Sequence, residues 1–148
     1  MDPRNDNAPN PEDVLLKLDD QPWLPFSPGV DYKLCRLDPV MGVWTIMIRM
    51  DDGGFFPPHK HLGAGEFYMV KGKLAYRAGS AEAGDYGYEP NGVYHEATTA
   101  VGETELLFTN HGAIAFLNED DSVAMVLDWE FFRDNPNGVQ LPAEQAAE

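Results

Sequence analysis

The sequence predicts an all-β protein with a single domain, built as a sandwich or barrel of short strands. Segments rich in β-branched and aromatic residues recur along the chain, and turn signals with Gly and Asp separate them at close intervals. The length of 148 residues suits one domain, and a hydrophobic fraction of 43% is ordinary for a globular chain. No internal repeat and no change in composition marks a boundary between domains.

The N-terminal part is predicted to be a flexible tail over residues 1–20, because Pro, Asn and Asp dominate its first thirteen positions. Within that tail, residues 14–19 are apolar enough to form a short strand. Residues 22–26 are apolar but contain two prolines, which predicts irregular backbone that packs on another surface. The first long strands are expected at 30–37 and 43–50, where β-branched and aromatic residues gather.

The rest of the chain continues the series after a turn at residues 51–54. Strands are expected at 59–61 and 66–70, with a hairpin turn at 71–73 and a return strand at 74–78. After a further turn, the remaining predicted strands cover 84–89, 94–98, 105–110, 113–117 and 123–129. A short helix is expected to start within 129–133. The predicted barrel therefore covers residues 21–134, and residues 135–148 form a C-terminal tail.

The net charge and the pattern of apolar residues disfavour several classes of partner. The formal net charge is −15, with 25 acidic against 10 basic residues, which disfavours nucleic acid and anionic membranes. No apolar segment is long enough to cross a bilayer, and the N-terminus lacks the apolar core of a signal peptide. A single cysteine, Cys35, excludes an internal disulfide. We therefore expect a cytoplasmic protein.

Three of the four histidines lie in two motifs, each of which begins with a glycine. The first, G-x5-H-x-H-x4-E, carries His59, His61 and Glu66, and the second, G-x5-P-x-G-x2-H, ends at His95. Residues two apart on a strand share a face, so His59 and His61 can present both imidazoles to one point. Converging imidazoles bind first-row transition metals, and three of them leave coordination positions open, as in catalytic sites. The donor set is compatible with Fe(II), Zn(II), Ni(II), Mn(II) and Cu(II).

Together the two motifs resemble the signature motifs of the cupin superfamily, whose fold is a double-stranded β-helix, a jelly-roll-like barrel. The resemblance implies that His59, His61 and His95 hold one divalent metal ion inside the barrel, with Glu66 as a candidate fourth ligand.

The sequence departs from the family pattern at two positions. Gly72 comes one residue early after the carboxylate, and Thr99 stands where the family often has an asparagine. The first departure bears on Glu66, because a one-residue slip turns a strand side chain to the opposite face. The fourth histidine, His111, lies at a predicted turn, where we expect exposure to solvent rather than metal binding.

Residues 59–77 also resemble a narrower group, which contains the acetylacetone-cleaving dioxygenases, the dihydroxyacetophenone dioxygenases and the metal-binding domain of ChrR-type anti-sigma factors. This resemblance extends over roughly residues 22–133. In the acetylacetone-cleaving enzymes three histidines hold Fe(II), and an Arg and a Glu line the pocket. Arg77 and Glu89 match those two positions. Spacing alone leaves their direction open, because bulges break strand alternation, and the resemblance favours an inward direction.

The resemblance implies an Fe(II) dioxygenase that cleaves a carbon–carbon bond of a small β-diketone or hydroxyketone. The substrate would bind the metal as its enolate, Arg77 and Glu89 would orient it and tune its protonation, and dioxygen would then react with it. Phe67, at the position of a pocket tyrosine in those enzymes, and the adjacent Tyr68 are the expected pocket residues. The expected cofactor is Fe(II), with Zn(II) or Ni(II) as alternatives. We also expect a homodimer or homotetramer, with residues 22–26 as a candidate contact.

Two other functions stay open at this point. One is a zinc-dependent or other non-oxygenase cupin, such as an isomerase or hydrolase. The other is a metal-binding sensor module of the ChrR type, whose relatives carry an additional N-terminal domain that binds a sigma factor. Residues 1–20 are too short for such a domain and contain no His or Cys for its zinc site, which favours an enzyme.

Overall fold

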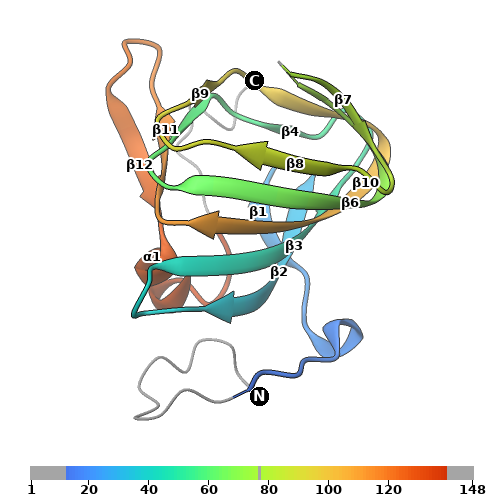
Figure 1. Cartoon of the computed structure of the whole chain (residues 1–148), viewed down its shortest axis with the longest axis vertical. Coiled ribbons are helices and arrows are strands. Elements are labelled where there is room, and N and C mark those ends of the chain that lie inside the picture. Colours follow the sequence, from blue (N-terminus) through green and yellow to red (C-terminus); the bar gives the residue numbers. More distant parts are fainter. Residues whose placement is uncertain (1–12, 77, 140–148) are drawn as a thin grey trace.

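Two antiparallel sheets make up the molecule (Figure 1), in a computed structural model that describes residues 13–76 and 78–139. The eight strands of the larger sheet are β1 (Leu24–Ser27), β2 (Val30–Leu37), β3 (Val43–Met50), β4 (Phe55–Phe56), β6 (Ala64–Tyr76), β7 (Gly79–Glu82), β8 (Tyr86–Glu89) and β10 (Thr98–His111). The four strands of the smaller sheet are β5 (His59–His61), β9 (Tyr94–His95), β11 (Ile114–Leu117) and β12 (Val123–Leu127). A 3₁₀ turn, η1 (Leu18–Asp20), and one helix, α1 (Trp129–Asp134), complete the described elements. The predicted all-β fold is confirmed.

The larger sheet runs in the order β1-β2-β3-β10-β6-β7, with β4 paired to β10 and β8 paired to β6, and the smaller sheet runs β12-β11-β5-β9. No strand pairing among the described residues joins the two sheets into a ring. The predicted barrel is therefore two facing sheets that backbone hydrogen bonds do not close. The edge strand β9, only two residues long, offers little backbone for further pairing.

The core lies between the two sheets and is largely aromatic. Strand β3 shows why, because every second residue is buried, from Trp44 to Met50. Helix α1 adds Phe132, whose ring lies 4.9 Å from Trp44 and 5.4 Å from Tyr32 between ring centroids. The helix begins where the Asp128 carboxylate accepts a hydrogen bond from the Phe131 amide, a normal N-cap. Each such buried aromatic side chain stabilises the fold by roughly 1.5–3 kcal/mol.

Two predictions for the N-terminal part are wrong. Residues 14–17 form no strand and residues 18–20 form the 3₁₀ turn, in a segment where the Leu15 side chain is almost fully exposed and has no sheet to pack against. Residues 24–27 do form a strand, β1. Proline is tolerated there because β1 is the edge strand of the sheet, so the missing backbone N–H faces no partner strand. Phe26 in that strand is buried in the core of its own chain.

The hairpin turn predicted at residues 71–73 is also wrong, because β6 passes straight through this segment. Gly72 has a φ of +77°, and the pairing of β6 with β10 shifts register beside it, between Val101 and Glu105. A Cβ atom at Gly72 would lie 2.4 Å from the Glu103 carbonyl oxygen. The glycine therefore marks a β-bulge, which bends the strand without reversing it.

The helix predicted near residues 129–133 is confirmed as α1. In the described part of the chain, no helix combines the length and the apolar character needed to span a membrane.

Candidate metal centre

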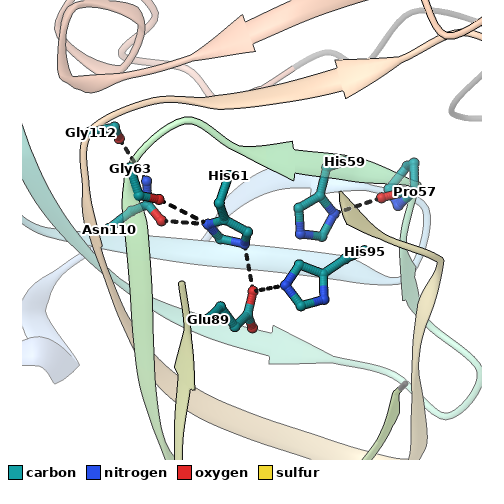
Figure 2. A network of polar contacts seen from close by, with 8 residues as sticks. All are labelled: Pro57, His59, His61, Gly63, Glu89, His95, Asn110 and Gly112. Carbon is teal, nitrogen blue, oxygen red and sulfur yellow. Dashed lines mark hydrogen bonds and ion pairs between the residues drawn. The ribbon is translucent and has the colours of Figure 1, made fainter. Parts of the chain in front are cut away.

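Three histidine rings meet where β5 and β9 pair (Figure 2). On β5, His59 and His61 are buried and Lys60 between them is exposed, as strand alternation requires. On β9, His95 lies directly opposite His59 in the register of the antiparallel pair. The ring centroids are 5.1 Å apart for His59–His61, 5.3 Å for His59–His95 and 5.1 Å for His61–His95. The structure thus brings together the three imidazoles that the motifs single out.

Glu89, the last residue of β8, faces this cluster from the larger sheet (Figure 2). Its Oε2 atom lies 2.5 Å from His61 Nε2 and 3.1 Å from His95 Nε2. Ligand atoms of His59, His61 and Glu89 all lie within 4.8 Å of one another, close enough to hold one metal ion. The sequence left the direction of Glu89 open, and the structure places it inward, beside the imidazoles.

Hydrogen bonds on the far side of two rings fix which nitrogen is free. His59 Nδ1 lies 2.9 Å from the Pro57 carbonyl oxygen. His61 Nδ1 lies 3.0 Å from Asn110 Oδ1 and 3.3 Å from the Gly63 carbonyl oxygen. These oxygens only accept hydrogen bonds, so both Nδ1 atoms carry the proton. The Nε2 atoms of His59 and His61 therefore keep their lone pairs for a metal.

The ring nitrogens that face Glu89 are the atoms that a metal ion would bind. Among the described residues, the buried side-chain nitrogen and oxygen atoms without a hydrogen-bond partner are Nε2 of His61 and Nε2 of His95. Buried polar atoms rarely go unpaired. The Glu89 carboxylate lies close to both, but a lone pair and a carboxylate repel each other unless a proton or metal ion lies between them. Three imidazoles and one carboxylate are donors that divalent transition metals prefer, so the residues present fit such an ion.

Burial also sets the protonation states that metal binding needs. Desolvation by burial, together with the neighbouring His61 and His95, lowers the pKa of His59 to about 4, against the opposing effects of the Pro57 hydrogen bond and Glu89. Burial raises the pKa of Glu89, but its contacts with His61 and His95 outweigh this and hold that pKa well below its usual value. A neutral imidazole and an ionised carboxylate are the forms that coordinate metals.

A small apolar cavity of about 50 Å³ adjoins the donor cluster, enough for a few water-sized groups. His59, Glu89 and Thr98 supply its polar wall, and the other lining side chains are apolar. Phe67 is one of them, and a Cβ atom at Gly87 would lie 2.2 Å from its Cζ atom, so this glycine leaves the space that the ring fills. The structure thus places Phe67 at the pocket, as expected.

Two candidate residues lie on the opposite face of β6. Glu66 accepts hydrogen bonds from the Tyr86 hydroxyl and from His111 Nε2, at 2.9 Å for the latter, so it is not placed as a metal ligand. Tyr68 is half-exposed and does not line the pocket. Alternation along the strand explains both corrections, because these residues flank the inward Phe67 on either side. Arg77 lies outside the described residues.

The sequence reasoning missed Asn110, which holds His61 from behind. Its signal was present, because Asn110 follows Leu106 and Phe108 on the inner face of β10 at a spacing of two. A polar residue in such an apolar series needs a buried partner.

Comparisons with known proteins agree with this fold. Residues 11–115 match the family model of the ChrR cupin-like domain. The acetylacetone-cleaving enzyme of Acinetobacter johnsonii is 27% identical over 134 residues, which are 83% of this chain and 88% of that protein. A proposed acetylacetone dioxygenase from Methylibium petroleiphilum superimposes with a TM-score of 0.79 at 29% identity, over 86% of this chain and 94% of that one.

A more distant structure is the anti-sigma factor ChrR of Rhodobacter sphaeroides in complex with SigE. It has a TM-score of 0.57 at 18% identity, over 64% of this chain and 51% of that one. At this identity the likeness shows a common fold alone.

Proposed function

Because the chain belongs to the ChrR cupin-like family, we propose that it is a mononuclear metal-dependent dioxygenase that cleaves a carbon–carbon bond of a small β-diketone or hydroxyketone. One observation carries the proposal: a cluster of three imidazoles and a carboxylate adjoins a small apolar cavity. The identities of 27% and 29% to acetylacetone-cleaving proteins, over most of each chain, support this reaction class.

The proposed cofactor is one divalent ion per chain, with Fe(II) preferred and Zn(II) or Ni(II) as alternatives. His59, His61 and His95 would hold it, and the Glu89 carboxylate, rather than the expected Glu66, lies beside these ligands. When bound, such an ion supplies Lewis-acid polarisation of a carbonyl group and, if it is iron, redox chemistry with dioxygen.

Glu89 is the residue best placed to move a proton. Its carboxylate is ionised, mostly buried, and lines the cavity together with His59. A β-diketone carries an acidic C–H between its two carbonyl groups, and a carboxylate at this position can accept that proton as the enolate forms. The matching role of Arg77, orientation of the substrate, stays a prediction.

The apolar wall performs a separate task. Phe67, Phe108 and Phe116 surround the space next to the donor cluster, which excludes bulk water from a bound ketone. Low local polarity also strengthens the electrostatic contacts of Glu89. The small volume favours a substrate of few heavy atoms.

The test is anaerobic purification, elemental analysis, and oxygen-uptake measurement after loading with Fe(II) or with Zn(II). We expect oxygen consumption with acetylacetone in the Fe(II) form and none in the Zn(II) form. An iron-loaded protein that consumes no oxygen over a panel of β-diketones and hydroxyketones would contradict the proposal. Turnover of such substrates by the zinc form without oxygen would instead assign a non-oxygenase function. Self-association stays a prediction, which light scattering of the same sample checks.

A further inference from the structure

Asn110 is a fully buried amide whose role the reaction itself does not require. Its side chain is 0% exposed, between the apolar inner face of β10 and the His61 ring. Burial of an amide is unfavourable unless both its polar atoms are hydrogen-bonded. Here both are, and the two partners differ in kind.

The partner on one side fixes the orientation of the amide. The Gly112 carbonyl oxygen accepts a hydrogen bond from Asn110 Nδ2 at 2.7 Å and a second from the Trp44 indole Nε1 at 2.8 Å. A carbonyl oxygen cannot donate, so the NH₂ group of Asn110 must face Gly112. The Asn110 oxygen therefore faces His61, and His61 Nδ1 must donate to it (Figure 2).

A glycine leaves the space in which the amide and the imidazole meet. A Cβ atom at Gly65 would lie 2.9 Å from Asn110 Oδ1, 2.9 Å from His61 Cε1 and 3.0 Å from Phe108 Cζ. A real Cβ atom cannot approach that closely, so any other residue at this position would displace the amide, the imidazole or both. The contact thus depends on Gly65 as well as on Asn110.

We propose that Asn110 is a positioning residue for the metal centre: held by Gly112 and Trp44, it locks His61 in the Nδ1–H tautomer and aims its Nε2 lone pair at the donor cluster. The inference rests on the metal-binding part of the proposed function and is independent of the substrate. A neutral imidazole otherwise distributes its proton between two nitrogens, and the Nε2–H form cannot bind a metal through Nε2. Asn110 removes that competing form.

The test compares Asn110→Leu, which has a similar size but no acceptor, with Asn110→Asp, which keeps an acceptor for His61. Long-range ¹H–¹⁵N correlation spectra of histidine-labelled, metal-free full-length protein report the tautomer of each ring. All variants carry Glu89→Gln for this measurement, so that the side chain 2.5 Å from His61 Nε2 can donate a hydrogen bond to its lone pair. We expect the Nδ1–H form of His61 with Asn110 unaltered and in Asn110→Asp, and a mixture with the Nε2–H form in Asn110→Leu. Competition titration with Zn(II) should show an affinity roughly 10–100-fold lower for Asn110→Leu, with most of the loss restored in Asn110→Asp.

Two further variants keep the test decisive. Gly65→Ala should give the same tautomer change and the same direction of affinity loss, which covers the case in which Asn110→Leu does not fold. Thr109→Val, the neighbouring residue on the outer face of β10, should alter neither quantity.

The outcomes separate this inference from the proposed function. An unchanged His61 tautomer, or unchanged Zn(II) affinity, in folded Asn110→Leu and Gly65→Ala would overturn the role of Asn110. If the unaltered protein binds no Zn(II), the metal site is refuted, and so is the proposed role of Asn110. If it binds Zn(II) and the iron form consumes no oxygen, the dioxygenase proposal fails while the role of Asn110 stands.

Discussion

His59 and His95 lie opposite each other on β5 and β9, and their rings stack with centroids 5.3 Å apart and an interplanar angle of 29°. The two residues come from different motifs, 36 positions apart in the chain. Their register therefore joins the two motifs into one site. A shift of one residue would turn His59 and His61 out of the cluster if it occurred on β5, or His95 if it occurred on β9.

This pairing predicts which histidines bind the metal. His95→Ala removes a donor, so metal affinity should fall by more than the roughly 10–100-fold typical of losing an outer partner of a ligand. His111→Ala should leave it unchanged, because His111 contacts Glu66 on the outer face. Elemental analysis and competition titration with Zn(II) measure both variants side by side. Equal metal content in the two would refute the ligand assignment.

The position of Glu89 predicts a different result for two glutamates. Glu89→Gln keeps the shape of the side chain but removes the charge between His61 and His95, so metal affinity and oxygen uptake should both decrease. Glu66→Gln is the matched control and should retain the metal content of the unaltered protein, because Glu66 lies on the outer face. The reverse result, with Glu66→Gln depleted of metal and Glu89→Gln unaffected, would restore Glu66 as the carboxylate ligand.

The stability of the metal-free protein should depend on the protonation of His59. Its pKa is about 4 in the folded protein, against about 6.5 for an ordinary histidine side chain, so the unfolded chain binds the proton more readily. The stabilising contribution is present above pH 6.5 and is lost as pH falls toward 4, by up to about 3 kcal/mol. Urea unfolding at several pH values in a chelating buffer measures the slope. His59→Leu should flatten it, and an equally steep slope in that variant would assign the effect to other groups.

The contact between Phe67 and Gly87 predicts a coupling between these two positions. Gly87→Ala places a methyl group against the Phe67 ring and should destabilise the protein by roughly 1–3 kcal/mol. Phe67→Leu removes the far atoms of the ring, so adding it to Gly87→Ala should recover part of that loss. Thermal unfolding of both single variants and the double variant gives the coupling energy. Strictly additive effects would show that the alanine methyl group at position 87 and the Phe67 ring do not clash.

Much of the fold follows from local patterns. Strand alternation in residues 43–50 and 59–61 depends only on the period-two geometry of extended backbone, so it predicts which residues of β3 and β5 are buried. The same rule places His59 and His61 on one face. By contrast, Gly72 carries a turn-like composition but bends a strand, because the pairing partner β10 decides whether the chain reverses there.

Within the site, the sequence by itself determined that His59 and His61 share a strand face and that three of the four histidines lie in motifs typical of metal binding. Only the tertiary structure decided that Glu89 faces the imidazoles while Glu66 faces solvent, and that Asn110 holds His61 from behind. The physical reason is distance along the chain. Side-chain direction along one strand is a local property, whereas the register between strands, the bulges that change it and the buried partners behind a ligand arise from contacts between residues far apart in sequence.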